Sequence, residues 1–315
     1  MSLTSELKVA SSPLGIFMRA EFPHLKSVVQ ELKASSKDVP SILLGYDEGY
    51  PLMLVGTAID LRIRHYVSDK PIENAVIDRG FDQLSRIEFA EFGDDFSLVH
   101  HGPDNRKFDA MEAALRGCWA EFSRRSGRLD DEAEDRLCRL CMLLATVEQY
   151  GRASLSSRGV EYLWPRRKRG LDRLLADVDD RIVGDLVALS RAFLETMPDI
   201  VIATDVVVGG SPIGAPEIGG ADFDFVSEGT LYEVKTTTNP GRVAIDALRQ
   251  MIGYLLLDWD DEFKIRRLGL VLPRQRTKVV YDVDELLGGK DLGEMRERMR
   301  LLVSTPGEAT SSAHS

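Results

Sequence analysis

The residues from 219 to 235 constrain the fold of this chain more than any other segment. Two short, largely apolar segments flank the dipeptide Glu228-Gly229. Glycine readily supplies the positive φ that a two-residue hairpin turn requires. The pattern therefore predicts a tight β-hairpin in which Ser227 pairs with Thr230.

The same register brings four charged side chains to one face of the hairpin. It places Asp224 opposite Glu233 and Asp222 opposite Lys235. Directly opposed Cβ atoms lie about 4.5–5.5 Å apart, and two carboxylates that close repel each other unless a positive charge lies between them. A divalent metal ion beside Lys235 would remove this repulsion and create a hydrolytic site. The alternative is the solvated face of an ordinary hairpin.

The order of Asp, a short gap and Glu-x-Lys resembles the PD-(D/E)XK nuclease superfamily. The next apolar segment, residues 242–259, predicts a helix with Gln250 and Tyr254 on one face, because they are four residues apart. This Gln-x-x-x-Tyr pair is similar to that of the RecB-like branch, where it lines the groove and positions the nucleic-acid strand. The resemblance covers about residues 200–285. It implies an α/β fold with a restriction-endonuclease-like core, in which helices flank a mixed β-sheet.

The resemblance also implies a metal-dependent nuclease, with Mg²⁺ or Mn²⁺ as the cofactor. Asp224 and Glu233 would hold the metal together with the backbone carbonyl of Val234. Lys235 would orient or activate the attacking water and contact the phosphate. Asp222 is the second candidate for the acidic position of the first strand, since Gly-x-x-Asp also fits the RecB-like pattern.

Other parts of the superfamily pattern have no unique match in the chain. The upstream acidic position is open between Glu195 and Glu217, and both also fit as solvated acids. No P-loop motif is present, so a helicase or ATPase partner would be a separate chain. The expected substrate is DNA, in repair, restriction or defence against foreign DNA. The alternatives are an RNA-directed nuclease and a non-catalytic nucleic-acid-binding or scaffold subunit.

The overall charge argues against a nucleic-acid enzyme, because the 315 residues carry a net charge of -11. Charge distribution decides binding, however, and basic residues do cluster. The run Arg166-Arg167-Lys168-Arg169 fits either a phosphate-contacting patch or a solvated linker. A second group beside the later strands is the stronger candidate for contacting DNA: Lys264, Arg266, Arg267, Arg274, Arg276 and Lys278.

The remaining sequence features predict a cytoplasmic protein without a membrane segment. No apolar run approaches the length of a membrane span, and the first residues lack the pattern of a signal peptide. The three cysteines, Cys118, Cys138 and Cys141, are too few for a four-thiolate iron–sulfur cluster. Since Cys138 and Cys141 lie in an apolar helical run, we expect buried free thiols.

Periodicity predicts a helical region at 1–164, and the resemblance implies a nuclease-like core at 165–303, with a soft boundary near Trp164. The small, polar composition of 304–315 predicts a disordered tail. The expected helices span 27–36, 52–67, 71–92, 104–125, 130–152, 182–197, 242–259, 282–287 and 291–303. Besides the hairpin, the expected strands span 200–208, 263–272 and 277–281.

Overall fold

The computed structural model describes residues 2–36, 41–46, 50–67, 75–92, 95–101, 106–122, 129–152, 161–201, 203 and 205–304. The chain forms two compact units. The first unit comprises Met1–Ser41 and Ala203–Ser315, and the second comprises Ile42–Ile202. The predicted boundary near Trp164 therefore differs from the observed division, and the expected tail lies almost wholly outside the described residues.

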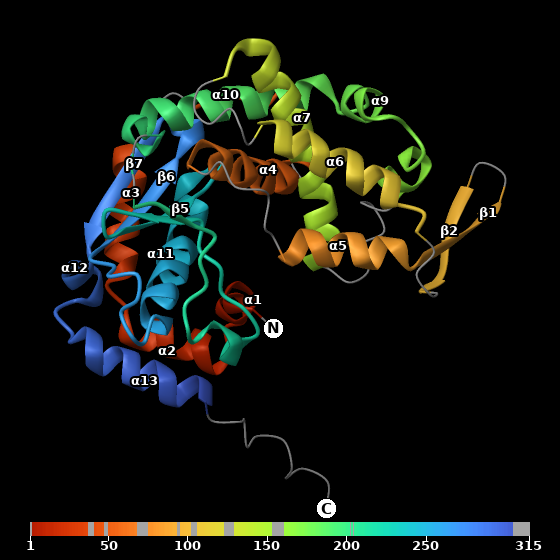
Figure 1. Ribbon diagram of the computed structural model, residues 1–315. Helices are drawn as coiled ribbons and strands as arrows, with labels where there is room; N and C mark the ends of the chain where they lie inside the picture. The colour runs from red at the N-terminus through yellow and green to blue at the C-terminus, as the bar shows by residue number, and fades with distance from the viewer. Residues whose placement is uncertain are drawn as a thin grey trace, which may run out of the picture. The chain divides into compact units, whose positions relative to one another are not determined.

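The first unit is α/β and contains an open, mixed, five-stranded sheet in the order β3-β4-β5-β6-β7 (Figure 1). Strands β4 and β5 pair antiparallel, β5 and β6 pair parallel, and β6 and β7 pair antiparallel. Helix α11 (Pro240–Leu257) makes the crossover between the two parallel strands. The strands are β3 (Val207–Val208), β4 (Phe225–Ser227), β5 (Thr230–Val234), β6 (Arg267–Leu272) and β7 (Thr277–Asp282).

The hairpin turn has the predicted register, because Ser227 pairs with Thr230. Glu228 and Gly229 adopt φ values of 49° and 68°, as a two-residue type I′ turn requires. The strand expected at 200–208 is much shorter than predicted. Residues Pro198–Val201 form a 3-10 helix, and only β3 joins the sheet.

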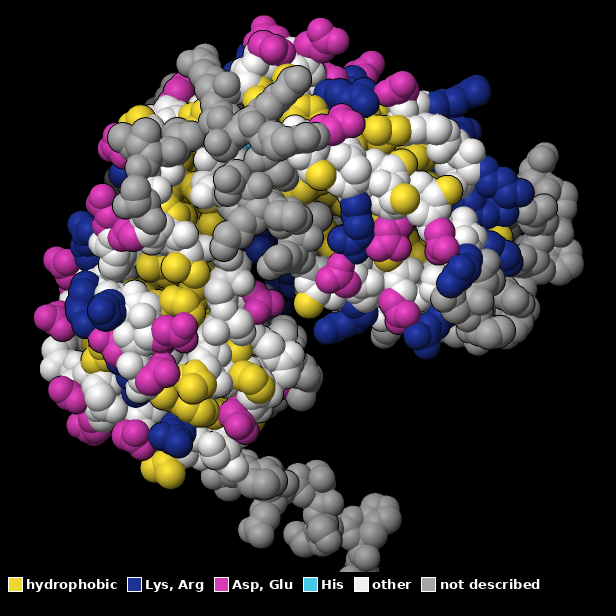
Figure 2. Space-filling model, in the orientation of Figure 1, with side chains coloured by type: hydrophobic (Ala, Val, Ile, Leu, Met, Phe, Trp, Pro, Cys, Tyr) yellow, Lys and Arg dark blue, Asp and Glu magenta, His cyan; other side chains and the backbone are white. Residues whose placement is uncertain are grey.

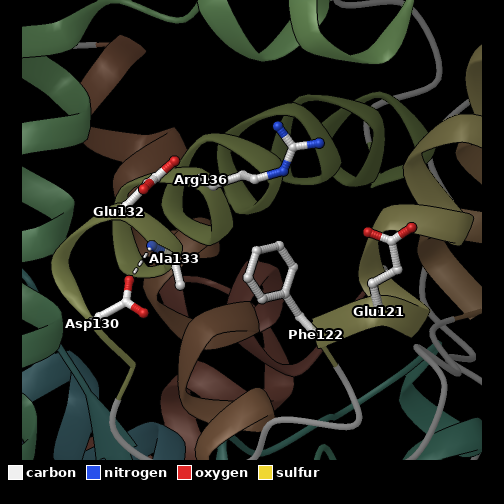
Figure 3. Close-up of a pocket in the computed structure, with 6 residues that line it drawn as sticks. All are labelled: Glu121, Phe122, Asp130, Glu132, Ala133 and Arg136. Carbon is white, nitrogen blue, oxygen red and sulfur yellow. Dashed lines mark hydrogen bonds between the residues drawn. The ribbon is translucent and has the colours of Figure 1, made fainter.

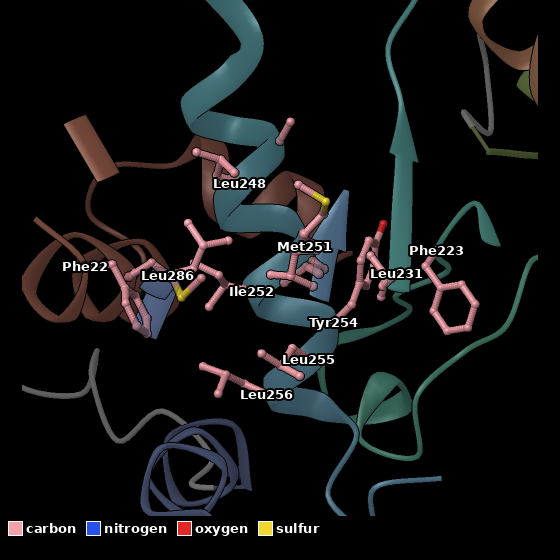
Figure 4. Packing of buried hydrophobic residues seen from close by; sticks show 14 of the residues in the cluster. Phe22, Phe223, Leu231, Leu248, Met251, Ile252, Tyr254, Leu255, Leu256 and Leu286 are labelled. Carbon is pink, nitrogen blue, oxygen red and sulfur yellow. The ribbon is translucent and has the colours of Figure 1, made fainter. Parts of the chain in front are cut away.

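The amino-terminal helices belong to the core of the first unit. Helices α1 (Leu3–Lys8), α2 (Pro13–Glu21) and α3 (Leu25–Ser36) share one apolar cluster with α11 and the sheet. Figure 4 shows Phe22 near Leu286 on one side of α11, where Leu248 and Ile252 are also drawn. Helices α12 (Val283–Leu287) and α13 (Leu292–Ser304) complete the unit. Residues 1–36 are thus part of the sheet-containing unit, although the sequence grouped them with the other helices of the region 1–164.

The second unit is mainly helical. Its helices are α4 (Tyr50–Val67), α5 (Ala75–Ser85), α6 (Asp109–Phe122), α7 (Asp131–Arg152), α9 (Leu171–Ala176) and α10 (Asp180–Thr196), with a 3-10 turn at Trp164–Arg166. The expected helix at 71–92 is wrong in its second half. Helix α5 ends at Ser85, and Ile87–Phe92 forms strand β1, which pairs with β2 (Asp95–His101). β-Branched and aromatic residues, which favour strands, occupy three of the six positions of Ile-Glu-Phe-Ala-Glu-Phe, which explains the difference.

Two further observations concern the described segments as a whole. Cys138 and Cys141 are buried free thiols, as predicted, and Cys118 is also buried and free. Within these segments, no helix combines the length and the apolar character needed to traverse a bilayer.

Helices α5 and α7 approach each other closely at two glycines. A Cβ atom added at Gly80 would lie 2.3 Å from the carbonyl oxygen of Val147, and one at Gly151 would lie 2.1 Å from that of Val76. Both distances are far below van der Waals contact. The backbones can touch here only because these residues have no side chain.

We therefore expect Gly80→Ala to destabilise the second unit by about 1–3 kcal/mol, since the helices must separate to admit the methyl group. Gly184 is the matched control, because a Cβ atom there meets nothing within 4 Å. Gly184→Ala should stabilise α10 by about 0.5–1 kcal/mol through helix propensity. Urea denaturation of both variants measures these changes. Equal effects of the two substitutions would contradict the close-packing argument.

A buried polar network joins α4, α7 and α10. Arg62 is fully buried and forms two hydrogen bonds with Glu134, from Nε to Oε1 at 2.9 Å and from Nη2 to Oε2 at 2.7 Å. Ser190 donates to the same carboxylate at 2.5 Å and is hydrogen-bonded to Tyr66. Glu134 is ionised, because Arg62 outweighs the effect of burial and lowers its pKa.

His65 completes this network in its neutral form. Its Nε2 lies 2.7 Å from the carbonyl oxygen of Phe122, and its Nδ1 lies 3.3 Å from Nη1 of Arg62. Because guanidinium can only donate, Nδ1 must accept and Nε2 must carry the proton. Burial, and then the charge of Arg62, lower the pKa of His65 to about 4.

We expect acid to weaken the second unit through His65. The unfolded chain binds a proton at this residue near pH 6.5, whereas the folded chain binds it only near pH 4. The contribution of neutral His65 to the free energy of unfolding is therefore complete above pH 6.5. It falls by on the order of 3 kcal/mol as the pH drops to 4. The measurement is the free energy of unfolding of wild type and His65→Gln at several pH values. A difference between the two proteins that does not change with pH would contradict this role.

Candidate active site

Asp224 lies where the β4–β5 ladder ends. The last pair of the ladder is Phe225 with Tyr232. Beyond it, Oδ2 of Asp224 accepts a hydrogen bond of 2.7 Å from the backbone N–H of Val234. The half-buried carboxylate of Asp224 thus takes the place of a backbone acceptor. This bond brings Asp224 to the same end of the hairpin as Glu233.

Glu233 presents a carboxylate in the interior of the first unit. The residue is 2% exposed. Its Oε1 lies 2.5 Å from Nζ of Lys235. Its Oε2 is buried and has no hydrogen-bond partner among the described atoms. A buried polar atom without a partner is costly and rare, so this oxygen has an unused capacity to bind a cation or a donor.

Lys235 follows Glu233 by two residues, so both side chains project from the same side of the strand. Burial alone would lower the pKa of Lys235, but the carboxylates of Glu233 and then Asp224 outweigh burial and raise the pKa. Lys235 is therefore a cation at neutral pH. In this state it can stabilise negative charge and orient a water molecule, but it cannot accept a proton.

Helix α11 extends the site through Gln250. Oε1 of Gln250 accepts from Nζ of Lys235 at 3.4 Å, and its Nε2 donates to the hydroxyl of Tyr254 at 2.6 Å. A chain of hydrogen bonds therefore runs from Glu233 through Lys235 and Gln250 to Tyr254. The spacing of four residues places the last two on one face of the helix, as predicted.

Tyr254 is 2% exposed, and its ring packs edge-on against Phe223 at 6.2 Å (Figure 4). Burial, and then Glu233, raise the pKa of its hydroxyl well above its usual value, so the phenol is neutral. In this conformation Tyr254 supports Gln250 rather than lining a surface. Tyr254 is therefore too buried to line a groove, whereas Gln250 is partly exposed and its role in positioning a strand stays a prediction.

The other acidic candidates are exposed, and the charge of Asp222 is close enough to Tyr254 to add to the rise in the pKa of its hydroxyl. Asp222 is exposed in the loop before β4, outside the ladder that was expected to pair it with Lys235. Glu217 is exposed in the 3-10 helix Ala215–Ile218, and Glu195 is exposed on α10 of the second unit. The described residues contain no cluster of three or more His, Cys, Asp or Glu side chains suited to a metal.

Arg274 and Gln275 have a role that the sequence did not suggest. Arg274 is fully buried and its Nε donates to the carbonyl oxygen of Thr236 at 2.9 Å. Nε2 of Gln275 donates to the carbonyl oxygen of Thr237 at 3.0 Å. Both side chains thus fix the backbone that follows Lys235. The only sequence signal is that they follow an apolar strand after one proline, Pro273.

This burial corrects our interpretation of the later basic group. Arg274 is inside the protein, and Arg266 forms an ion pair of 2.6 Å with Asp261. Lys264, Arg267, Arg276 and Lys278 are exposed. On the face drawn in Figure 2, acidic and basic side chains are interspersed. The group is therefore a weaker candidate for contacting DNA than the sequence indicated.

A pocket of about 350 Å³ lies in the second unit (Figure 3). It is lined by Glu121, Phe122, Asp130, Glu132, Ala133 and Arg136. Asp130 accepts a hydrogen bond of 2.9 Å from the backbone N–H of Ala133 and so caps α7. None of the residues predicted for the site lines this pocket.

Comparison of the chain with protein-family models, with curated proteins and with solved structures found no match.

Proposed function

We propose that this protein is a metal-dependent nuclease that hydrolyses phosphodiester bonds, with DNA as the expected substrate. The observation that carries the proposal is the buried carboxylate of Glu233. One of its oxygens contacts a lysine ammonium, and the other has no partner among the described atoms. The strand order supports the proposal as well, because a hairpin followed by a crossover helix and a parallel strand is the arrangement expected of a restriction-endonuclease-like core.

The donor set fits Mg²⁺ or Mn²⁺. Mg²⁺ binds through one or two carboxylates and completes its coordination with water and substrate phosphate oxygens. Glu233 and Asp224 supply two carboxylates at one end of the hairpin, and Val234, whose carbonyl is the third expected ligand, directly follows Glu233 and donates its N–H to Asp224. The bound metal would lower the pKa of a water and neutralise charge on the phosphate.

The protein's own groups divide the remaining tasks. The ammonium of Lys235 is held by Glu233 and Gln250, so it is positioned to orient a water and to stabilise negative charge on a phosphate oxygen. Tyr254 fixes the amide of Gln250 from the buried side. Arg274 fixes the backbone after Lys235.

The second candidate is a nucleic-acid-binding subunit that has the same fold but no activity. The buried orientation of Tyr254 is compatible with it, whereas the unsatisfied oxygen of Glu233 favours the enzyme. RNA is an alternative substrate of the enzyme, since no feature of the site distinguishes the sugar.

The deciding experiment is cleavage of labelled single- and double-stranded DNA and RNA in Mg²⁺, Mn²⁺ or EDTA. Wild type is compared with Lys235→Met and with Lys26→Met, which removes an exposed lysine of α3. The proposal requires metal-dependent cleavage that is lost only in Lys235→Met. Binding without cleavage on every substrate would favour the non-catalytic subunit.

A further inference from the structure

A cluster of basic residues lies in the second unit, at the 3-10 turn Trp164–Arg166 and the residues that follow it. Residues 161–177 contain five basic side chains and three acidic ones, a net charge of +2 within a chain of net charge -11. Asp172, one of the three acids, pairs with Arg136 of α7 at 3.0 Å. The stretch is therefore locally positive although the protein is acidic.

Two of these arginines are held rigidly on aromatic rings. The guanidinium carbon of Arg167 lies 3.9 Å from the centre of the Trp164 ring, and its Nη1 donates to the Trp164 carbonyl at 2.6 Å. In the same way, the guanidinium carbon of Arg166 lies 4.0 Å from the centre of the Tyr162 ring, and its Nη1 donates to the Tyr162 carbonyl at 2.8 Å. Stacking together with a backbone hydrogen bond fixes each guanidinium before any partner binds. Such fixed groups lose little conformational entropy on binding.

Further cations surround this pair. Nζ of Lys107 lies 5.3 Å from the centre of the Trp164 ring, and both Lys107 and Lys168 are exposed. Arg166 and Arg169 share the carboxylate of Asp177, so that one negative charge faces two positive ones. We call Lys107, Arg166, Arg167, Lys168 and Arg169 the stacked-arginine surface.

The Trp164 ring holds Arg167 in place and is not available for stacking on a base. Trp164 is only 2% exposed, because the chain packs around it. A base could not stack on this ring, so recognition would have to proceed through charge. Guanidinium groups match the geometry of phosphate oxygens and bind them through paired N–H donors.

We propose that the stacked-arginine surface binds the phosphodiester backbone of a nucleic acid without reading its sequence. The choice of nucleic acid over other polyanions rests on the proposed function, whereas the charge and the geometry belong to this surface alone. Contacts to phosphate position a strand but carry no sequence information. This surface would therefore supply affinity that the acidic chain otherwise lacks.

The test is the binding of a short fluorescein-labelled DNA duplex in EDTA, measured by fluorescence anisotropy over a range of salt concentrations. Wild type is compared with Arg167→Glu/Lys168→Glu. The control is Arg181→Glu/Arg191→Glu, which makes the same change in net charge at two exposed arginines of α10. The surface variant should bind about tenfold more weakly or worse, and the slope of log K against log salt should become shallower by about two. The control should retain the wild-type slope.

Equal losses in the two double variants, or an unchanged slope in the surface variant, would overturn the proposal. Arg167→Gln/Lys168→Gln serves as a second, milder variant, and the melting temperature shows that each protein is folded. Excess polyglutamate is expected to compete poorly with DNA. If polyglutamate competed as well as DNA at the same concentration of negative charge, the surface would bind anions in general, and the choice of nucleic acid would be overturned. Because the assay contains no divalent metal, its outcome is independent of cleavage at the hairpin.

Discussion

Cleavage is expected to fall by roughly a thousandfold in Glu233→Gln, the scale of removing one electrostatic contact to the transition state. The amide has the shape of the carboxylate but not the charge that would hold a metal. Stability should change by less than about 1 kcal/mol, because the substitution removes a buried charge while Lys235, whose side chain is 28% exposed, can still reach water.

The matched control for this variant is Glu228→Gln. It makes the same chemical change at an exposed position of the same hairpin and should leave the rate and the melting temperature unchanged. Rates come from single-turnover cleavage at saturating metal, and stability comes from thermal unfolding without metal. A Glu233→Gln protein that unfolds, or one that cuts at the wild-type rate, would show that Glu233 is a structural residue.

The largest loss of stability is expected from Glu134→Gln in the second unit. The fully buried guanidinium of Arg62 would keep its charge and lose the anion that compensates it. Removing one partner of a buried ion pair costs about 3–5 kcal/mol. Asp82→Asn is the control, because the pair of Asp82 with Arg86 is more than half exposed on both sides. It should cost about 0–1 kcal/mol.

The measurement is denaturation by guanidinium chloride, followed by fluorescence in a Trp259→Phe background. The two remaining tryptophans, Trp119 and Trp164, then both report on the second unit. Replacing the pair together, with Arg62→Met/Glu134→Leu, should cost less than Glu134→Gln alone, since no charge is left buried without a partner. A double variant that is less stable than the single one would contradict this interpretation.

The sequence predicted the hairpin well because its signals are local. A turn dipeptide, the period-two alternation and the spacing of Gln250 and Tyr254 depend on neighbouring residues only. The register of Ser227 with Thr230 followed directly from the turn. The short distance between Lys235 and Gln250 depends on how α11 packs on β5, which no local pattern encodes.

Non-local contacts explain what the sequence did not predict. Residues 2–36 pack on α11, more than two hundred positions away, and periodicity alone gives no partner for an apolar helix face. Arg274 was predicted to be a surface cation because arginine is normally exposed. Its buried position depends on an acceptor, the carbonyl of Thr236, that lies 38 residues earlier in the chain.

The division of the first unit between the two ends of the chain determines the order in which the protein can form on the ribosome. Helices α1 to α3 are synthesised first, but α11 and the sheet that complete their core are synthesised last. The intervening residues 42–202 form a unit of their own, which can fold while synthesis continues. The apolar faces of α1 to α3 therefore stay without their partners until α11 and the strands after residue 203 have been synthesised.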